Sequence, residues 1–209
     1  MVGFIGYYIR AMKEKIKYLI ILALTALPLT ASGQNYELSK NGTTIIIKGT
    51  SSLHNWEMDV RAYNSEIQVD HEGSTAGIYN VSFVCRATDL KSESNLMDKK
   101  AYDALKAKDF PEIKFESTSK TEIVINDNKF SGNLNGRLII AGKTETVTIP
   151  FSGSVDGNNA ISISAETDLL MSRFNIAPPT AMLGTLKTGD KISISLSLQY
   201  VRTAQLSQQ

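Results

Sequence analysis

From about residue 36 onward, apolar residues recur at every second position of the chain. Successive side chains of a β-strand point to opposite faces, so a period of two indicates strands that bury one face. In chain order the alternating positions are Ile45 and Ile47; Trp56, Met58 and Val60; Val81, Phe83 and Cys85; Leu134, Leu138 and Ile140; Val147, Ile149 and Phe151; Ile161 and Ile163; and Ile192, Ile194, Leu196 and Leu198. This pattern predicts an all-β fold.

Clusters of turn-forming residues separate these segments. Glycine, asparagine and aspartate gather at residues 40–42, 70–73, 126–128, 141–143, 156–159 and 188–190. Such clusters between alternating runs are typical of strand connections. The strands are short and regularly spaced, and almost no helical sequence lies between them, which excludes an alternating parallel α/β sheet. An antiparallel barrel or sandwich remains.

One helix interrupts the strands. Between Asn95 and Lys106 the apolar residues fall at helical spacing, Lys99 and Lys100 are expected on the opposite face, and Pro111 lies beyond the end. We expect this helix to cover one end of the barrel.

A second non-strand stretch, from Met171 to Leu186, is unusually apolar for a loop and includes Phe174 and Ile176. Composition favours packing on the barrel end as part of the core, and an apolar rim at a ligand entrance is the alternative. The stretch around Met182 is expected to cover the other end of the barrel. Lys187, just beyond it, is expected on a solvated turn.

The N-terminus has the anatomy of an export signal. Three lysines within residues 13–17 precede a largely apolar run of 12 residues, Tyr18–Leu29, and the small residues Ala31 and Gly33 follow. That run is shorter than the roughly 20 residues that a membrane-spanning helix needs. We therefore expect residues 1–33 to be a signal peptide that is cut before Gln34.

Residues 34–209 then form a single domain, exported to the periplasm or secreted, and Met12 is an alternative start of the chain. Without the four basic residues and one acidic residue of the first 33, 18 basic and 20 acidic residues remain, a net charge of −2. Nucleic acids and anionic membrane surfaces need a basic field. We expect no nucleic-acid partner and no stable membrane insertion, and the oligomeric state stays open, a dimer included.

Few residues could carry catalysis. A single cysteine, Cys85, and two histidines, His54 and His71, exclude a disulfide framework and a metal site rich in cysteine or histidine. Cys85 lies in an apolar strand, where a thiol is most often a small buried hydrophobe. The acidic residues between 89 and 98 are expected to be solvated or to cap the helix. We expect no enzymatic activity, no metal and no cofactor.

The interior of the predicted barrel could be hollow. An eight-stranded barrel is just wide enough to be filled by side chains or to hold one small ligand. Small residues at strand positions, Gly132, Gly136, Gly153 and Ala165, and several flexible methionines indicate room inside. A solid core is an equally open alternative.

Several segments in order along the chain resemble the YceI-like lipid- and polyisoprenoid-binding family. They are Gly49–Trp56, Lys91–Ser94 with Met97 and Asp98, Ala104–Leu105, Phe110–Phe115 and Gly132–Thr144. The likeness extends to Tyr200 and so covers nearly all of residues 34–209. It implies an exported, lipocalin-like antiparallel β-barrel of about eight strands, with one short helix at a barrel end. It also implies a tunnel that takes a long isoprenoid or another fatty amphiphile, and it does not imply catalysis.

The candidate ligand-binding residues follow from this resemblance and from the alternation. Those expected to face the interior are Trp56, Met58, Phe83, Cys85, Phe115, Leu138 and Ile140. A one-residue error in the register of a strand would turn the side chains assigned to its inner face outward. Arg86, Lys91 and His54 are candidates for the head group. Arg86 solvated on the outer face and His54 in a structural role are the simpler interpretations.

Two functions remain at this stage. The first is an exported protein that holds a long-chain amphiphilic lipid for transport, storage or stress protection. The second is a structural or stress-response surface module whose barrel is filled and whose rim binds a protein partner.

Overall fold

The structure is a computed structural model that describes residues 33–156, 160–181 and 185–203. Apart from Gly33, the predicted signal peptide lies outside the described residues, and so does Met182. Among the described residues no helix is long and apolar enough to cross a membrane.

Strands dominate the described chain and account for 64% of it, which confirms the all-β prediction. The strands are β1 (Gln34–Leu38), β2 (Thr44–Ser51), β3 (Trp56–Val60), β4 (Asn64–Glu72), β5 (Thr75–Arg86), β6 (Leu90–Lys91), β7 (Glu112–Ser117), β8 (Thr121–Val124), β9 (Lys129–Ile140), β10 (Lys143–Val155), β11 (Ile161–Leu170), β12 (Thr180–Ala181) and β13 (Leu186–Arg202). The α-helix is α2 (Asn95–Ala104), and two 3₁₀ turns are η1 (Ala87–Asp89) and η2 (Met171–Phe174).

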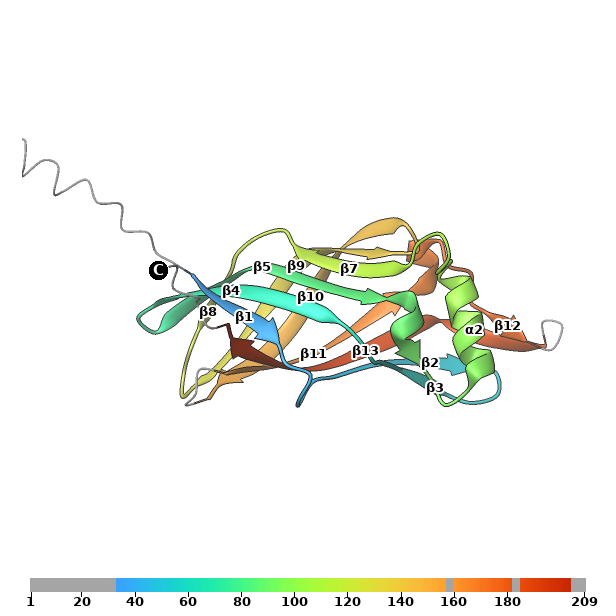
Figure 1. The fold of residues 1–209 in the computed structure, drawn as a ribbon, viewed down its shortest axis with the longest axis horizontal. Coiled ribbons are helices and arrows are strands. Elements are labelled where there is room, and N and C mark those ends of the chain that lie inside the picture. Colours follow the sequence, from blue (N-terminus) through green and yellow to red (C-terminus); the bar gives the residue numbers. More distant parts are fainter. Residues whose placement is uncertain (1–32, 157–159, 182–184, 204–209) are drawn as a thin grey trace, which may run out of the picture. The chain divides into compact units, whose positions relative to one another are not determined.

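Eight strands close into an antiparallel barrel, as predicted (Figure 1). Their order is β1-β4-β5-β7-β9-β10-β11-β13, and β13 pairs with β1 to complete the ring. Each strand of this ring pairs antiparallel with both neighbours, so the barrel has no free edge along this path.

The barrel wall continues beyond β1 through three further strands. β2 follows β1 along the same edge of β13, β3 pairs with β2, and the short β6 pairs with β3. β1 and β2 therefore act as two halves of one strand, interrupted at residues 39–43. This extension carries the wall toward α2.

Two tight turns fix the register of the central strands. Asp127 and Asn128 have φ of 48° and 62°, and Ala141 and Gly142 have φ of 50° and 78°. Turns with two positive φ values match the twist of an antiparallel hairpin. They confirm the turns predicted at residues 126–128 and 141–143.

The turn predicted at residues 188–190 is wrong. These residues lie within β13, where the five residues Thr188–Ile192 face only the three residues Gly49–Ser51 of β2. The glycine and aspartate thus mark a β-bulge, which needs the same backbone freedom as a turn but leaves the strand continuous.

The helix begins where the sequence predicted and ends two residues earlier. The Ser94 side chain caps it by accepting a hydrogen bond from the Met97 N–H at 3.4 Å. Lys106, expected within the helix, instead has a φ of 54°. α2 lies at the end of the barrel that also carries β12 (Figure 1), and Lys100 Nζ donates to the Thr180 carbonyl oxygen at 2.9 Å. The helix and the apolar stretch after β11 therefore meet at one end, and do not cover two ends as predicted.

The two ends of the barrel differ in packing. Near β1, β4 and β8 the interior is filled by fully buried side chains, which include Tyr36, Ile67, Val69, Ile123 and Phe130. Toward α2, many inward-facing side chains are only partly buried. One end is thus filled, whereas toward α2 buried residues such as Met58, Leu90 and Phe174 form a wall around a hollow.

Candidate functional site

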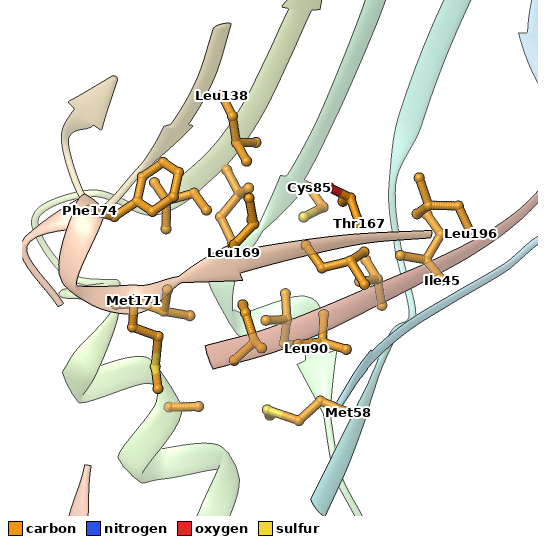
Figure 2. Close-up of a pocket in the computed structure, with 18 of the residues that line it drawn as sticks. Ile45, Met58, Cys85, Leu90, Leu138, Thr167, Leu169, Met171, Phe174 and Leu196 are labelled. Carbon is orange, nitrogen blue, oxygen red and sulfur yellow. The ribbon is translucent and has the colours of Figure 1, made fainter. Parts of the chain in front are cut away.

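A cavity of about 580 Å³ occupies the hollow part of the barrel and opens at the α2 end. Aliphatic and aromatic side chains from β2, β3, β5, β9, β10, β11, β13 and α2 form most of its wall. Figure 2 shows Ile45, Met58, Leu90 and Leu196 on one side and Leu138, Leu169 and Phe174 on another. Its volume lies within the range of about 300–1,000 Å³ that is typical of small-molecule sites.

The burial pattern of β13 shows the same hollow. Ile192, Ile194, Leu196 and Leu198 alternate toward the interior, line the cavity and yet are only half-buried. An inward-facing side chain in a packed core would be covered on all sides. These four side chains retain accessible surface because they border open volume.

All seven residues expected to face the interior do line the cavity. They are Trp56, Met58, Phe83, Cys85, Phe115, Leu138 and Ile140. The alternation therefore placed the inner face of these strands correctly. Their contact with a ligand stays a prediction.

The three head-group candidates lie in different places. His54 lies at the mouth of the cavity, exposed, in the loop between β2 and β3. Arg86 is exposed and does not line the cavity, because Cys85 takes the inward position of β5 and its neighbour points outward. Lys91 is also outside the lining, where Nζ lies 2.7 Å from the Tyr102 hydroxyl and 3.6 Å from Asp98 Oδ2. The structure brings only His54 to the cavity.

The sequence prediction missed two lysines at the same mouth. Lys100 and Lys187 both line it. Lys100 lies three residues after Met97 and four before Ala104, so helical spacing puts it on the face that lines the cavity, not on the opposite face as expected. Lys187 belongs to β13 and not to a solvated turn. The spacing of Lys100 was a usable signal, whereas the position of Lys187 depends on the unforeseen bulge.

The apolar stretch after β11 packs as core, as composition favoured, and its residues Met171, Pro179 and Leu186 also line the cavity. Its role at a ligand entrance stays a prediction. Phe174 and Ile176 are buried in the main core and also line the cavity. Leu170, Leu53 and Leu96 line the cavity as well and are strongly exposed, at 43%, 68% and 67%. Apolar side chains therefore surround the opening.

The glycines do not provide the room that the sequence suggested. Gly132, Gly136 and Gly153 are not cavity-lining residues; each lies under an aromatic ring, of Phe151, Phe115 and Phe130 respectively. A Cβ atom at Gly136 would approach Phe115 Cζ to 2.3 Å. The missing side chains make space for rings of the barrel, while Ala165 does line the cavity.

A hydroxyl pair lies among the deeper lining residues. Ser65 Oγ donates to the Ser82 carbonyl oxygen at 2.6 Å, so the Tyr200 hydroxyl is the donor in its 2.7 Å contact with Ser65 Oγ. Burial raises the pKa of Tyr200 to about 12, against the opposing effect of the Ser65 hydrogen bond. This pair stays neutral and satisfied at ordinary pH.

Cys85 is a buried free thiol in the cavity wall. Burial, helped by the charge of Asp89, raises its pKa to about 12. A thiol that remains protonated is a poor nucleophile. Cys85 thus acts as apolar lining, as its sequence context indicated.

Asp98 is neither solvated nor the cap of α2, the two roles that the sequence predicted for it. It is 4% exposed and accepts hydrogen bonds from the Ser92 N–H and Oγ, both at 2.7 Å. Burial alone would raise the pKa of Asp98, but the two Ser92 hydrogen bonds and nearby Lys91 lower it. The carboxylate fastens the first turn of α2 to the segment before it.

Solved structures share this fold. A polyisoprenoid-binding domain from Saccharophagus degradans, implicated in plant cell wall breakdown, matches with a TM-score of 0.62 at 7% identity, over 80% of this chain and 98% of that one. BcnA of Burkholderia cenocepacia matches with a TM-score of 0.58 at 17% identity, over 75% and 95% of the two chains. A YceI protein of Campylobacter jejuni matches with a TM-score of 0.55 at 17% identity, over 71% and 85%. At these identities the matches establish the fold alone.

Among curated proteins no sequence matches this chain. The YceI-like domain family, by contrast, matches residues 36–200 of the chain. That span includes the whole barrel from within β1 to near the end of β13, and with it the cavity. The protein therefore belongs to the YceI-like domain family.

Proposed function

We propose that this protein holds one long-chain amphiphile, an isoprenoid or a fatty chain, inside its barrel. The observation that carries the proposal is the apolar cavity of about 580 Å³ with an opening at the α2 end. The similarity to a domain described as polyisoprenoid-binding supports the same ligand class. The protein would serve as a carrier, as a store or as protection of the lipid.

The energetics suit such a ligand. Burial of one methylene group contributes about 0.8 kcal/mol, so a dozen carbons contribute about 10 kcal/mol. The loss of translational and rotational freedom on association costs about 4–15 kcal/mol. A long chain can therefore offset this cost without any polar contact in the barrel. The cavity also argues for this proposal over the alternative of a filled barrel with a protein-binding rim.

Native mass spectrometry of protein purified from the cells that make it tests the proposal. A copurified adduct that solvent extraction removes, and that lipid mass spectrometry identifies as a long-chain amphiphile, is the expected result. Protein that carries no adduct and binds no long-chain lipid offered to it would contradict the proposal.

We also propose that the protein is exported to the periplasm or secreted. The lysines, apolar run and small residues before Gln34 support this, as argued from the sequence. N-terminal sequencing of the protein from the producing cell should find Gln34 first. A chain that still begins at Met1 or Met12 would overturn the export proposal and leave the lipid-binding proposal intact.

A further inference from the structure

We infer that the amphiphile carries an anionic head group, a carboxylate or a phosphate, held at the cavity mouth by Lys100 and Lys187. This inference rests on the proposed function and specifies its ligand class. The apolar chain would lie in the barrel, and the head group would remain at the α2 end.

The charge of the lining has one sign. Among the described residues, the cavity wall contains two lysines, Lys100 and Lys187, and His54, and it contains no aspartate or glutamate. The chain as a whole has 22 basic and 21 acidic residues. The exclusion of carboxylates from this wall therefore sets the site apart from the rest of the molecule.

Hydrogen bonds and strand pairing bring the three basic residues to one place. Lys100 Nζ donates to the Thr180 carbonyl oxygen, and Thr180 lies opposite Lys187 in the β12–β13 pairing. The Lys187 N–H donates to Ser52 Oγ at 3.0 Å, and the Ser52 N–H donates to the Lys187 carbonyl oxygen at 2.9 Å. His54 lies two residues further along the same loop. The mouth thus gathers two ammonium groups, from α2 and β13, beside the imidazole of His54 in the β2–β3 loop.

Neither lysine pairs with a carboxylate in the part of the chain that the structure describes. Lys91, Lys114, Lys120, Lys143 and Lys191 each lie within 4.0 Å of a carboxylate oxygen, whereas Lys100 and Lys187 have no such partner among the described residues. Lys100 makes one hydrogen bond, to a carbonyl oxygen, and its ammonium has three donors. Two unpaired ammonium groups beside an apolar cavity favour an anion over a neutral head group.

A titration with matched probes tests the inference. Palmitate, palmityl phosphate and palmityl alcohol share one apolar chain and differ in head group. At low ionic strength we expect both anions to bind at least tenfold more tightly than the alcohol. Added salt should reduce this preference, because the lysines lie at an open mouth.

Variants assign the preference to the two lysines. Lys100→Gln combined with Lys187→Gln should weaken binding of both anions about tenfold and leave the alcohol unchanged. The single Lys187→Gln variant, at an exposed position, should give part of the effect without a change in thermal unfolding. Lys129→Gln, at the far end of β9 and outside the cavity lining, is the matched control and should bind all probes as the wild type does.

The outcomes separate the two claims. If the alcohol binds as tightly as both anions, or if the lysine variants bind them unchanged, the head-group inference is overturned and the proposed function stands. If no probe binds, the proposed function itself fails. A preference for only one of the anions supports the inference and identifies the head group.

Discussion

Single residues set how closely the barrel wall packs, and glycines under aromatic rings do this most clearly. Gly153 lies opposite Phe130 in the β9–β10 pairing, and an added Cβ would lie 2.4 Å from Phe130 Cζ and 2.5 Å from the Ser162 carbonyl oxygen. The ring could move aside, but the carbonyl belongs to the neighbouring strand. Glycine is required here for space.

Gly153→Ala should therefore lower the free energy of unfolding by about 1–3 kcal/mol, the usual effect of overpacking. Urea unfolding measures this change. Ser152→Ala, at the exposed neighbouring position, is the control and should stay within about 0.5 kcal/mol of the wild type. An unchanged midpoint for Gly153→Ala would show that the strands separate easily at this point.

Tyr200 makes the free energy of unfolding depend on pH in the alkaline range. Burial raises its folded-state pKa to about 12, above the value of about 10 in an unfolded chain. The contribution of Tyr200 to the free energy of unfolding is complete below pH 10. It is lost as the pH rises through 12, because in this range the Tyr200 hydroxyl ionises only in the unfolded state. The wild type should lose about 2 kcal/mol more than Tyr200→Phe between pH 10 and pH 12. Cys85 contributes equally to both proteins, so parallel pH profiles would exclude a buried, neutral Tyr200.

At the scale of elements, the attachment of α2 controls the cavity mouth. The helix contributes Lys100 to the mouth, and the buried Asp98 fastens its first turn through Ser92. The pKa of Asp98 is lowered, so its stabilising effect is present above the unfolded pKa of about 4 and lost as the pH falls through the folded value.

Asp98→Ala should leave the Ser92 N–H without its partner, and the Ser92 hydroxyl with only the Ser94 carbonyl oxygen, and so cost about 1–3 kcal/mol. Hydrogen exchange should show faster opening of α2, with the distant β9–β10 hairpin unaffected. Asp103→Ala, at an exposed position on the same helix, is the matched control. Equal exchange of α2 in both variants would mean that packing alone holds the helix.

The features that could be predicted from the sequence are those that depend on local periodicity, such as which side chains of a strand face inward. The alternation of Trp56 with Met58, and of Phe83 with Cys85, placed these side chains inward because the period of a strand is fixed. The bulge at Thr188–Ile192 and the position of Lys187 could not be predicted, since they depend on how β13 pairs with a strand distant in sequence. The partners of Gly136 and Asp98 likewise come from other segments.

At the scale of the whole molecule, the barrel combines a packed end with a hollow end. The buried cluster around Tyr36 and Phe130 closes one side, and α2 lies beside the opening on the other. The packed end stabilises the fold through buried apolar side chains, while the other end contains the cavity. Under the proposed function, a ligand would enter at the α2 end and one barrel would hold one chain.

Leu138 and Arg137 are adjacent on β9 and face opposite sides of the wall. Leu138 is half-buried and lines the cavity, whereas Arg137 is exposed and pairs with Glu116 at 3.0 Å. Leu138→Trp should fill part of the cavity without disturbing the packed end. Arg137→Gln loses one surface ion pair, which is worth about 0–1 kcal/mol, and leaves the cavity unchanged.

Isothermal titration of the lipid-free protein with palmitate tests whether the barrel holds a lipid chain inside. We expect saturable binding of one chain per barrel by the wild type and by Arg137→Gln, and its loss in Leu138→Trp, with all three proteins equally folded by circular dichroism. No saturable binding by the wild type, or undiminished binding by Leu138→Trp, would contradict a ligand held inside the barrel.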